Sequence, residues 1–186
     1  MLTFNFSPFP ILETNRLLLR RLSKNDVAAI LKLRGDAENM KFIPRPLAKT
    51  EQDALVHFEM IDEKIINNEG IKWAITVKPN DDVVGIIGHY RIKPEHFRAE
   101  IGYMILPEFQ GIGITTEAIK ATVNYGFDIM NLHSIEAIID PNNFASERVL
   151  LKNGFVKEAH FIENEFYDGQ FLDTVIYSIL KRNRLY

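Results

Sequence analysis

The order of apolar and polar side chains divides the chain into short strands and amphipathic helices. Apolar runs with a period of two, or without polar interruption, predict strands, and apolar positions spaced three and four apart predict helices. The expected strands cover residues 17–19, 73–77, 83–92, 101–105, 134–139, 155–166 and 171–180. The expected helices follow Ser23, span 50–68, run from the glycines near 113 to about Met130, and span 144–153.

Turn-forming residues indicate how these elements are joined. The segment 78–82 (Lys-Pro-Asn-Asp-Asp) and the pair Asp168-Gly169 each link two strands as a hairpin. The resulting order of elements predicts a mixed α/β (α+β) fold, in which helices pack against a mixed sheet. The aromatic residues within 1–12 have no period, so we expect this segment to cross the surface as an arm. Residues 38–49 are expected to form a loop.

The composition fits a single globular domain covering residues 1–186. The chain is 46% hydrophobic, carries a formal net charge of −3 and has no cysteine. The absence of cysteine excludes disulfides, thiolate metal ligands and cysteine nucleophiles. Without a signal-peptide core or a long apolar span, we expect a cytoplasmic protein that does not contact membranes. A slightly acidic chain without a run of basic residues also argues against a nucleic-acid partner.

The stretch from Ala99 to Gly126 carries the main chemical signal. A strand stops at Pro107, and Gly111 and Gly113 then allow a tight turn directly before an amphipathic helix. The first amides of such a helix have no partner in the chain and lie at the positive end of the helix dipole. The arrangement is therefore suited to binding a phosphate or pyrophosphate.

Two common nucleotide-binding motifs do not match this stretch. The dinucleotide fingerprint requires a third glycine where Thr116 stands, and the nucleoside triphosphate loop requires a lysine earlier than Lys120. A glycine pair alone also occurs in ordinary tight turns. At the level of this motif, a phosphate site and a plain turn both remain open.

Two motif blocks and the order of elements resemble the GNAT superfamily of acyl-CoA-dependent N-acetyltransferases. Gln110–Thr115 is similar to its pyrophosphate loop, with Thr115 in place of a small residue, and Asn143–Phe155 is similar to its later coenzyme-side helix. The likeness spans nearly the whole chain. It implies a GNAT-like fold with a central, mostly antiparallel sheet of about seven strands and about four helices. It also implies acetyl-CoA as cosubstrate.

Further similarities indicate the RimJ/RimL-type branch, which includes acetylases of ribosomal-protein N-termini. They lie in Glu13–Arg20, Glu100–Tyr103 and Asp173–Leu180. The branch also contains acetyltransferases of small amines. The resemblance therefore implies transfer to a primary amine, either a protein N-terminus or a small molecule, directly within a ternary complex. A homodimer is also compatible with it.

The resemblance assigns coenzyme A to the strand, the loop and two helix starts. The pyrophosphate would bind amides from Gly111 to Thr116, and the pantetheine arm would pair with the main chain of the preceding strand. An amide near Met104 or Ile105 would polarise the thioester oxygen. The expected binding residues are Met104, Ile105, Leu106, Gln110, Gly111, Ile112, Gly113, Ile114, Thr115, Thr116, Asn143 and Ser146.

The resemblance also supplies two catalytic candidates, each with a structural alternative. Glu100 would take a proton from the amine through water, or would be a solvated carboxylate beside Arg98. Ser146 would protonate or hydrogen-bond the sulfur, because the tyrosine of many relatives is replaced by Leu150. Asn143 and Ser146 would otherwise be simple helix caps.

The remaining candidates are weaker. His89 and His133 have no partners at metal-ligand spacing, so no metal is implied, and Trp73 is expected in the core. The residues that could line an acceptor site are Phe42, Arg45, Tyr103, Tyr167 and Phe171. Two other functions remain as alternatives, namely a non-catalytic acyl-CoA-binding regulatory module and an unrelated nucleotide-binding domain.

Overall fold

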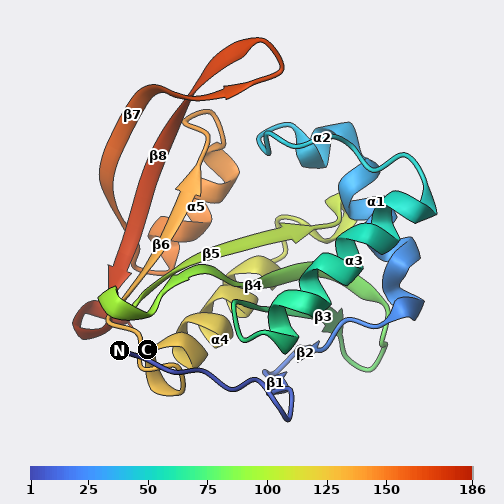
Figure 1. The fold of residues 1–186 in the computed structure, drawn as a ribbon, viewed down its shortest axis with the longest axis horizontal. Helices are drawn as coiled ribbons and strands as arrows, with labels where there is room; N and C mark the ends of the chain where they lie inside the picture. The colour runs from blue at the N-terminus through green and yellow to red at the C-terminus, as the bar shows by residue number, and fades with distance from the viewer. Residues whose placement is uncertain (186) are drawn as a thin grey trace.

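The computed structural model describes residues 1–185, whose strands form one sheet in the order β1-β2-β3-β4-β5-β6-β8-β7 (Figure 1). Every neighbouring pair is antiparallel except β5 and β6, which are parallel. The strands are β1 (Leu12–Glu13), β2 (Leu17–Arg20), β3 (Ile71–Val77), β4 (Val83–Lys93), β5 (Arg98–Ile105), β6 (Ser134–Ile139), β7 (Val156–Tyr167) and β8 (Gln170–Leu180).

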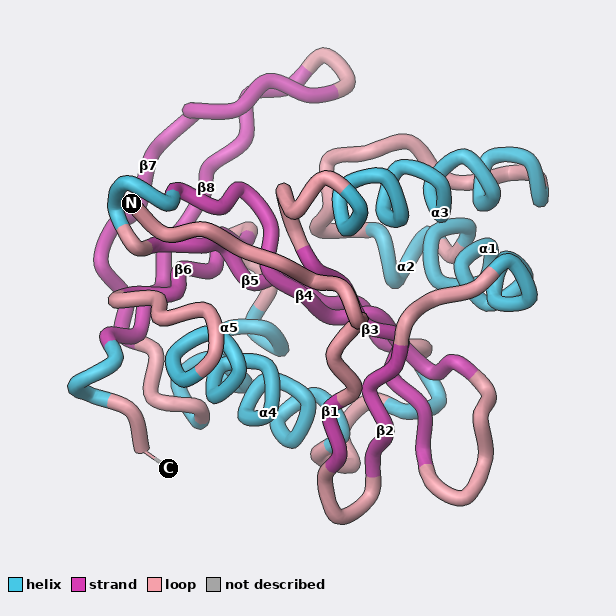
Figure 2. The backbone as a smooth tube through the Cα atoms, turned by 60° about the horizontal axis from the view of Figure 1, so that its bottom comes forward, coloured by secondary structure: helices cyan, strands magenta, loops and turns pink. Residues whose placement is uncertain are grey.

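Helices cover both faces of the sheet (Figure 2). On one face lie α1 (Val27–Gly35), α2 (Ala37–Met40) and α3 (Glu51–Ile66), and on the other lie α4 (Ile114–Asp128) and α5 (Phe144–Lys152). Single 3-10 turns cover Lys24–Asp26, Pro94–His96, Pro107–Phe109 and Lys181–Asn183. Among residues 1–185, no helix combines the length and the apolar character needed to cross a membrane.

The expected mixed fold is confirmed, with two short elements that the apolar pattern did not predict. Strand β1 has only two residues, and α2 has four, of which all but Ala37 lie in the segment expected to be a loop. The Asp36 side chain accepts a hydrogen bond from the amide of Asn39 and so caps α2. Neither element is long enough to show a period, which is why the sequence pattern missed both.

The N-terminal segment is more than a surface arm. Phe6 is 3% exposed within the core, and the ring of Phe9 lies 6.0 Å from that of Trp73. Trp73 is fully buried, as expected, and also contacts Tyr125 of α4 at 5.1 Å between ring centroids. The first residues therefore anchor the chain on the central strands.

Helix α4 buries the apolar side that its period predicts. Ile119, Val123 and Phe127 have no exposed surface, whereas Ile129 at the end of the helix is 66% exposed. Burial of this stripe fixes α4 against β4, and so fixes the glycine turn that precedes the helix.

We predict that Ile119→Ala lowers the free energy of unfolding by about 2–5 kcal/mol, because it removes buried methyl groups and leaves a cavity. The matched control Ile129→Ala should change it by less than about 0.5 kcal/mol, since that side chain is in solvent. Urea denaturation followed by circular dichroism measures both. Equal losses in the two variants would contradict this account of the core.

Candidate active site

The sheet opens between β5 and β6, directly after Glu100. The last residues paired between these strands are Glu100 and Glu136. Beyond that point β5 pairs only with β4, and β6 pairs only with β8. Figure 1 shows β6 diverging from β5 at this place. A stretch of β5 backbone from Ile101 to Ile105 therefore has no strand on one side.

The register of β5 against β4 decides which peptide groups face this gap. The amide of Leu106 donates to the carbonyl of Val84, so these two residues form a hydrogen-bonded pair. Bonded and non-bonded pairs alternate along an antiparallel ladder, so Met104 and Gly102 also direct their peptide groups to β4. Tyr103 and Ile105 direct theirs into the gap, whereas the amide of Ile101 belongs to the pairing of Glu100 with Glu136. Within the predicted set, the amides of Met104 and Leu106 are thus unavailable to a ligand, and that of Ile105 is available.

A tight turn leads from β5 to the N-terminus of α4, as the sequence predicts. Gly111 and Gly113 have φ angles of 75° and 84°, in the left-handed region that favours glycine. Gly113 is the N-cap residue, and no side chain caps the helix. The amides of the first helical turn, from Ile114 to Thr116, are therefore left for a ligand. The Gln110 side chain donates to the Ile105 carbonyl at 3.3 Å and joins the turn to the strand.

An ion pair from the N-terminal region supports this turn. Arg16 donates to the carbonyl of Ile112 at 3.0 Å and to the carboxylate of Glu117 at 2.7 Å. Thr14 also donates to Glu117, at 2.6 Å. Burial would raise the pKa of Glu117, but these hydrogen bonds outweigh it and lower the pKa. The arginine offsets the negative charge of Glu117 beside the open amides.

Glu100 is a buried carboxylate with two partners from β4. It is 3% exposed, accepts a hydrogen bond from the Tyr90 hydroxyl at 2.5 Å, and forms an ion pair with Arg91 at 2.9 Å. Arg98 pairs with Glu136 instead, at 2.8 Å. The alternative of a solvated carboxylate beside Arg98 is therefore wrong.

The environment of Glu100 favours its neutral form. Burial raises the pKa of this carboxyl, and the hydrogen bond from Tyr90 and the charge of Arg91 lower it by less, so the net shift is upward. Arg91 reaches the carboxylate from a bulge in β4, where its φ is 45°. A raised pKa is suited to a group that must both accept and release a proton near neutral pH.

Ser146 shares a hydrogen bond with Tyr103 across the gap, at 2.9 Å between the two hydroxyl oxygens. Burial is the main cause that raises the pKa of Tyr103 to about 12, so its phenol stays protonated. The Asn143 side chain accepts a hydrogen bond from the amide of Ser146 at 3.1 Å and caps α5. The capping expected for Asn143 is thus observed. The Ser146 hydroxyl is oriented by the phenol.

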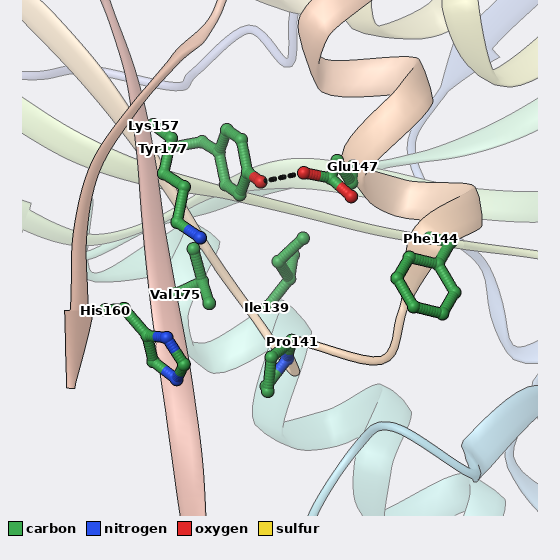
Figure 3. Close-up of a pocket in the computed structure, with 8 residues that line it drawn as sticks. All are labelled: Ile139, Pro141, Phe144, Glu147, Lys157, His160, Val175 and Tyr177. Atoms are coloured by element: carbon green, nitrogen blue, oxygen red, sulfur yellow. Dashed lines mark hydrogen bonds between the residues drawn. The ribbon is translucent and has the colours of Figure 1, made fainter. Parts of the chain in front are cut away.

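Helix α5 is also held by a second tyrosine hydroxyl. Tyr177 of β8 donates to the carboxylate of Glu147 at 2.5 Å. Figure 3 shows this bond beside a cavity of about 250 Å³ between α5, the end of β6 and the β7–β8 hairpin. Leu150, where many relatives place a tyrosine, is fully buried and takes no part in the gap.

The two catalytic candidates approach the gap from opposite faces. Side chains alternate along β5, so Glu100 lies on the face covered by α3, and Tyr103 lies with Ser146 on the face covered by α4 and α5. Side chains on both faces of the sheet can reach a ligand that lies in the gap. The structure therefore brings Glu100, Ser146 and the turn around one opening.

The two histidines considered in the sequence lie apart from this opening. His89 is fully buried, its Nε2 lies 2.9 Å from the carbonyl of Thr122, and burial lowers its pKa to about 4. His133 lies in the loop before β6. Within residues 1–185, no group of three or more metal-ligating side chains comes together.

The fold and this site define an acetyltransferase. A model of the acetyltransferase (GNAT) domain matches residues 16–156, and the chain belongs to this family. It is 35% identical to the uncharacterized N-acetyltransferase YoaA of Bacillus subtilis, over 93% of this chain and 98% of that protein. It is 26% identical to the spermidine N(1)-acetyltransferase of Escherichia coli, over 90% and 87% of the two chains.

The fold is shared with the RimJ/RimL group. The structure of RimL, a ribosomal L7/L12 α-N-protein acetyltransferase in complex with coenzyme A, superposes with a TM-score of 0.83. The match covers 92% of this chain and 98% of that one at 20% identity. At this identity the likeness concerns the fold. Together with the family match, it identifies the chain as an acetyltransferase of RimJ/RimL-like architecture.

Four residues at the site were not assigned these roles from the sequence. They are Arg16 at the turn, Tyr90 and Arg91 at the buried carboxylate, and Tyr103 at the serine. Arg16 lies in one of the blocks that carry the family likeness, which was a signal. The other three make their contacts between β4, β5 and α5. No spacing along the sequence predicts these contacts.

We predict that carbon-13 NMR of the carboxyl groups shows Glu100 titrating above an ordinary glutamate. Arg91→Gln should raise this pKa further, because it removes the positive charge that favours the carboxylate. Arg184→Gln removes an ion pair of similar length with Asp128, at the far end of α4, and should leave the Glu100 titration unchanged. Titration of Glu100 at or below the ordinary value would refute the burial argument.

Proposed function

We propose that the chain transfers an acetyl group from acetyl-CoA to a primary amine, directly within a ternary complex. The observation that carries the proposal is the gap between β5 and β6. It begins at a buried carboxylate, is crossed by a serine–tyrosine pair, and lies beside an uncapped helix N-terminus. Acetyl-CoA supplies an activated thioester, and the residues around the gap bind it, orient it and move protons.

The chain has matching groups for the two polar parts of the cosubstrate. The open amides from Ile114 to Thr116 suit a pyrophosphate, and a Cβ added at Gly111 would meet nothing within 4 Å, so the turn is open to a ligand. The peptide groups of Tyr103 and the amide of Ile105, which face the gap, suit an extended chain that carries amides. The Ile105 amide is the proposed donor to the thioester oxygen.

Glu100 is the proposed general base. It lies at the point where the gap begins, and its carboxylate accepts a proton from the attacking amine, through water, as the new carbon–nitrogen bond forms. The raised pKa brings this carboxyl closer to neutral pH. Since the ionised form is the active one, the rate should increase as the pH rises through the pKa of Glu100.

Ser146 is the proposed acid on the opposite face. Its hydroxyl donates a proton or a hydrogen bond to the sulfur as the carbon–sulfur bond breaks. The Tyr103 and Ser146 hydroxyls share a hydrogen bond. In the proposed mechanism the Tyr103 phenol is its donor, which leaves the serine proton free to point into the gap. Tyr103 is thus a positioning residue. Many relatives have a tyrosine on α5 at the position of Leu150. In this chain the phenol comes instead from Tyr103 on β5.

We predict that Gly111→Glu weakens acetyl-CoA binding at least tenfold in calorimetric titration, because a carboxylate would lie beside the pyrophosphate site. The control is Gly169→Glu in the β7–β8 turn. There φ is 80° and an added Cβ also meets nothing within 4 Å, so the backbone strain is matched. The control should bind like the wild type. Equal affinity in both variants would exclude this turn as the pyrophosphate site.

We predict that Glu100→Gln and Ser146→Ala each lower kcat by about 10²–10⁴ and leave the dissociation constant of acetyl-CoA nearly unchanged. Ser146→Thr should retain much of the rate. Tyr103→Phe should lower kcat in the wild type but have no further effect in the Ser146→Ala variant, because it acts through the serine. Release of free thiol measures the rates.

Two results would change the assignment. Additive losses from Tyr103→Phe and Ser146→Ala would show that the phenol acts on its own. Tight acetyl-CoA binding without thiol release for any amine, in the wild type and in all variants, would instead support the non-catalytic acyl-CoA-binding module.

A further inference from the structure

Basic side chains gather on the α3 face of the sheet, next to Glu100. They are Arg34 at the end of α1, Arg45 in the loop after α2 and Lys72 on β3. Within residues 1–185, none of the three forms an ion pair with a carboxylate. This is unusual in a chain whose net charge is −3. Arg45 is exposed, whereas Arg34 and Lys72 are partly buried. Unpaired basic groups away from open solvent cost free energy, so this cost falls on Arg34 and Lys72.

Contacts with Tyr90 tie this cluster to the site. The Lys72 ammonium lies 5.2 Å from the centroid of the Tyr90 ring, and the hydroxyl of the same ring contacts Glu100. Gly88 makes room for Lys72, because a Cβ there would lie 2.6 Å from the lysine Cγ. The ammonium and the Glu100 carboxylate thus both contact the side chain of Tyr90.

The arginines reach the same region. The Arg34 guanidinium lies 3.5 Å from the carbonyl of Pro46, against the segment that carries Arg45. Burial, together with the charges of Arg34 and Lys64, lowers the pKa of Lys72 to about 8, and the charge of Glu100 acts in the opposite direction. His57 of α3 lies in this field too, and burial with the charges of Arg34 and Lys72 lowers its pKa to about 3.

Glu100 forms no ion pair with this cluster, although its charge favours the protonated form of Lys72. Its two oxygens are taken by the Tyr90 hydroxyl and by Arg91. A second negative charge, brought by a ligand, would pair with the basic groups and lower the cost of burying them. An ammonium group in the same place would be repelled.

We propose that Arg34, Arg45 and Lys72 form an anion-binding subsite, and that the acceptor is a primary amine that carries a carboxylate. Its amine would meet Glu100, and its carboxylate would meet the basic cluster across the Tyr90 ring. This inference rests on the proposed acetyl transfer. It separates the chain from polyamine acetylation, in which the far end of the acceptor is cationic. Two sources have the required chemistry, namely free amino carboxylates and peptide N-termini followed by an acidic residue.

The test compares three amines with the same amino end, using the full chain and saturating acetyl-CoA. They are γ-aminobutyrate, butylamine and putrescine, whose far ends are anionic, neutral and cationic. We expect kcat/KM for γ-aminobutyrate to exceed that for butylamine at least tenfold, mainly through KM, with putrescine the slowest. Equal or faster acetylation of butylamine or putrescine would overturn the proposal.

Variants localise the preference. Lys72→Met and Arg34→Gln should each reduce the ratio of kcat/KM between γ-aminobutyrate and butylamine at least threefold, whereas Arg34→Lys, which keeps the charge, should preserve it. Lys32→Met, an exposed change on the same helix as Arg34, should preserve both rates. Circular dichroism checks that each variant is folded. An unchanged ratio in folded Lys72→Met and Arg34→Gln would also overturn the proposal.

A second arm separates the two sources of the carboxylate. Ala-Glu amide and Ala-Gln amide are compared as acceptors, and a tenfold preference for the acidic dipeptide identifies peptide N-termini as the source. No such preference, with γ-aminobutyrate still favoured, identifies free amino carboxylates. Either result supports the subsite.

Binding without turnover separates failure of this inference from failure of the proposed function. The protein is loaded with coenzyme A and titrated with the same three amines in a calorimeter. Tighter binding of γ-aminobutyrate that is lost in Lys72→Met supports the subsite, even if no amine is acetylated. If γ-aminobutyrate does not bind more tightly than butylamine and putrescine, the subsite is rejected, even if other amines are acetylated.

Discussion

The separation of β5 from β6 is the feature on which the rest of this site depends. Both strands belong to one sheet, yet main-chain pairing stops at Glu100 because β5 continues with β4 and β6 continues with β8. The peptide groups beyond that point need hydrogen-bond partners, and an extended ligand with its own amides can provide them. The same divergence leaves an opening that connects the two faces of the sheet. The proposed binding of the cosubstrate and the proposed proton transfers therefore both depend on a single break in the ladder.

The groups around this opening lie on two faces of the sheet, with a different proposed role on each face. On the α3 face, burial and the Tyr90–Arg91 pair set the protonation of Glu100. On the other face, the turn, the N-terminus of α4 and the start of α5 present amides and the Ser146 hydroxyl. Tyr103 belongs to the strand that separates these faces, and its phenol crosses to α5. The two proposed catalytic groups, Glu100 and Ser146, thus lie on opposite faces of β5.

Charge is distributed unevenly around the site. Arg16 offsets Glu117 beside the helix N-terminus, and Arg91 offsets Glu100 at the gap. The cluster of Arg34, Arg45 and Lys72 has no such counter-charge among residues 1–185, although the whole chain is acidic. Paired charges stabilise the site itself, whereas an unpaired cluster stores electrostatic free energy that a ligand of opposite charge can release.

The sequence by itself determined most of the fold, and it predicted a cosubstrate site. Apolar periods located β2 to β8 and the four longer helices, and the glycine turn before α4 indicated a pyrophosphate, because these signals are local. Only the tertiary structure decided which peptide groups of β5 are free, since that depends on the register with β4. It also placed Tyr90 and Arg91 on Glu100, Tyr103 on Ser146, and Arg34 near Lys72. These contacts join residues far apart in the sequence or follow from a strand bulge, and no pattern along the chain encodes them.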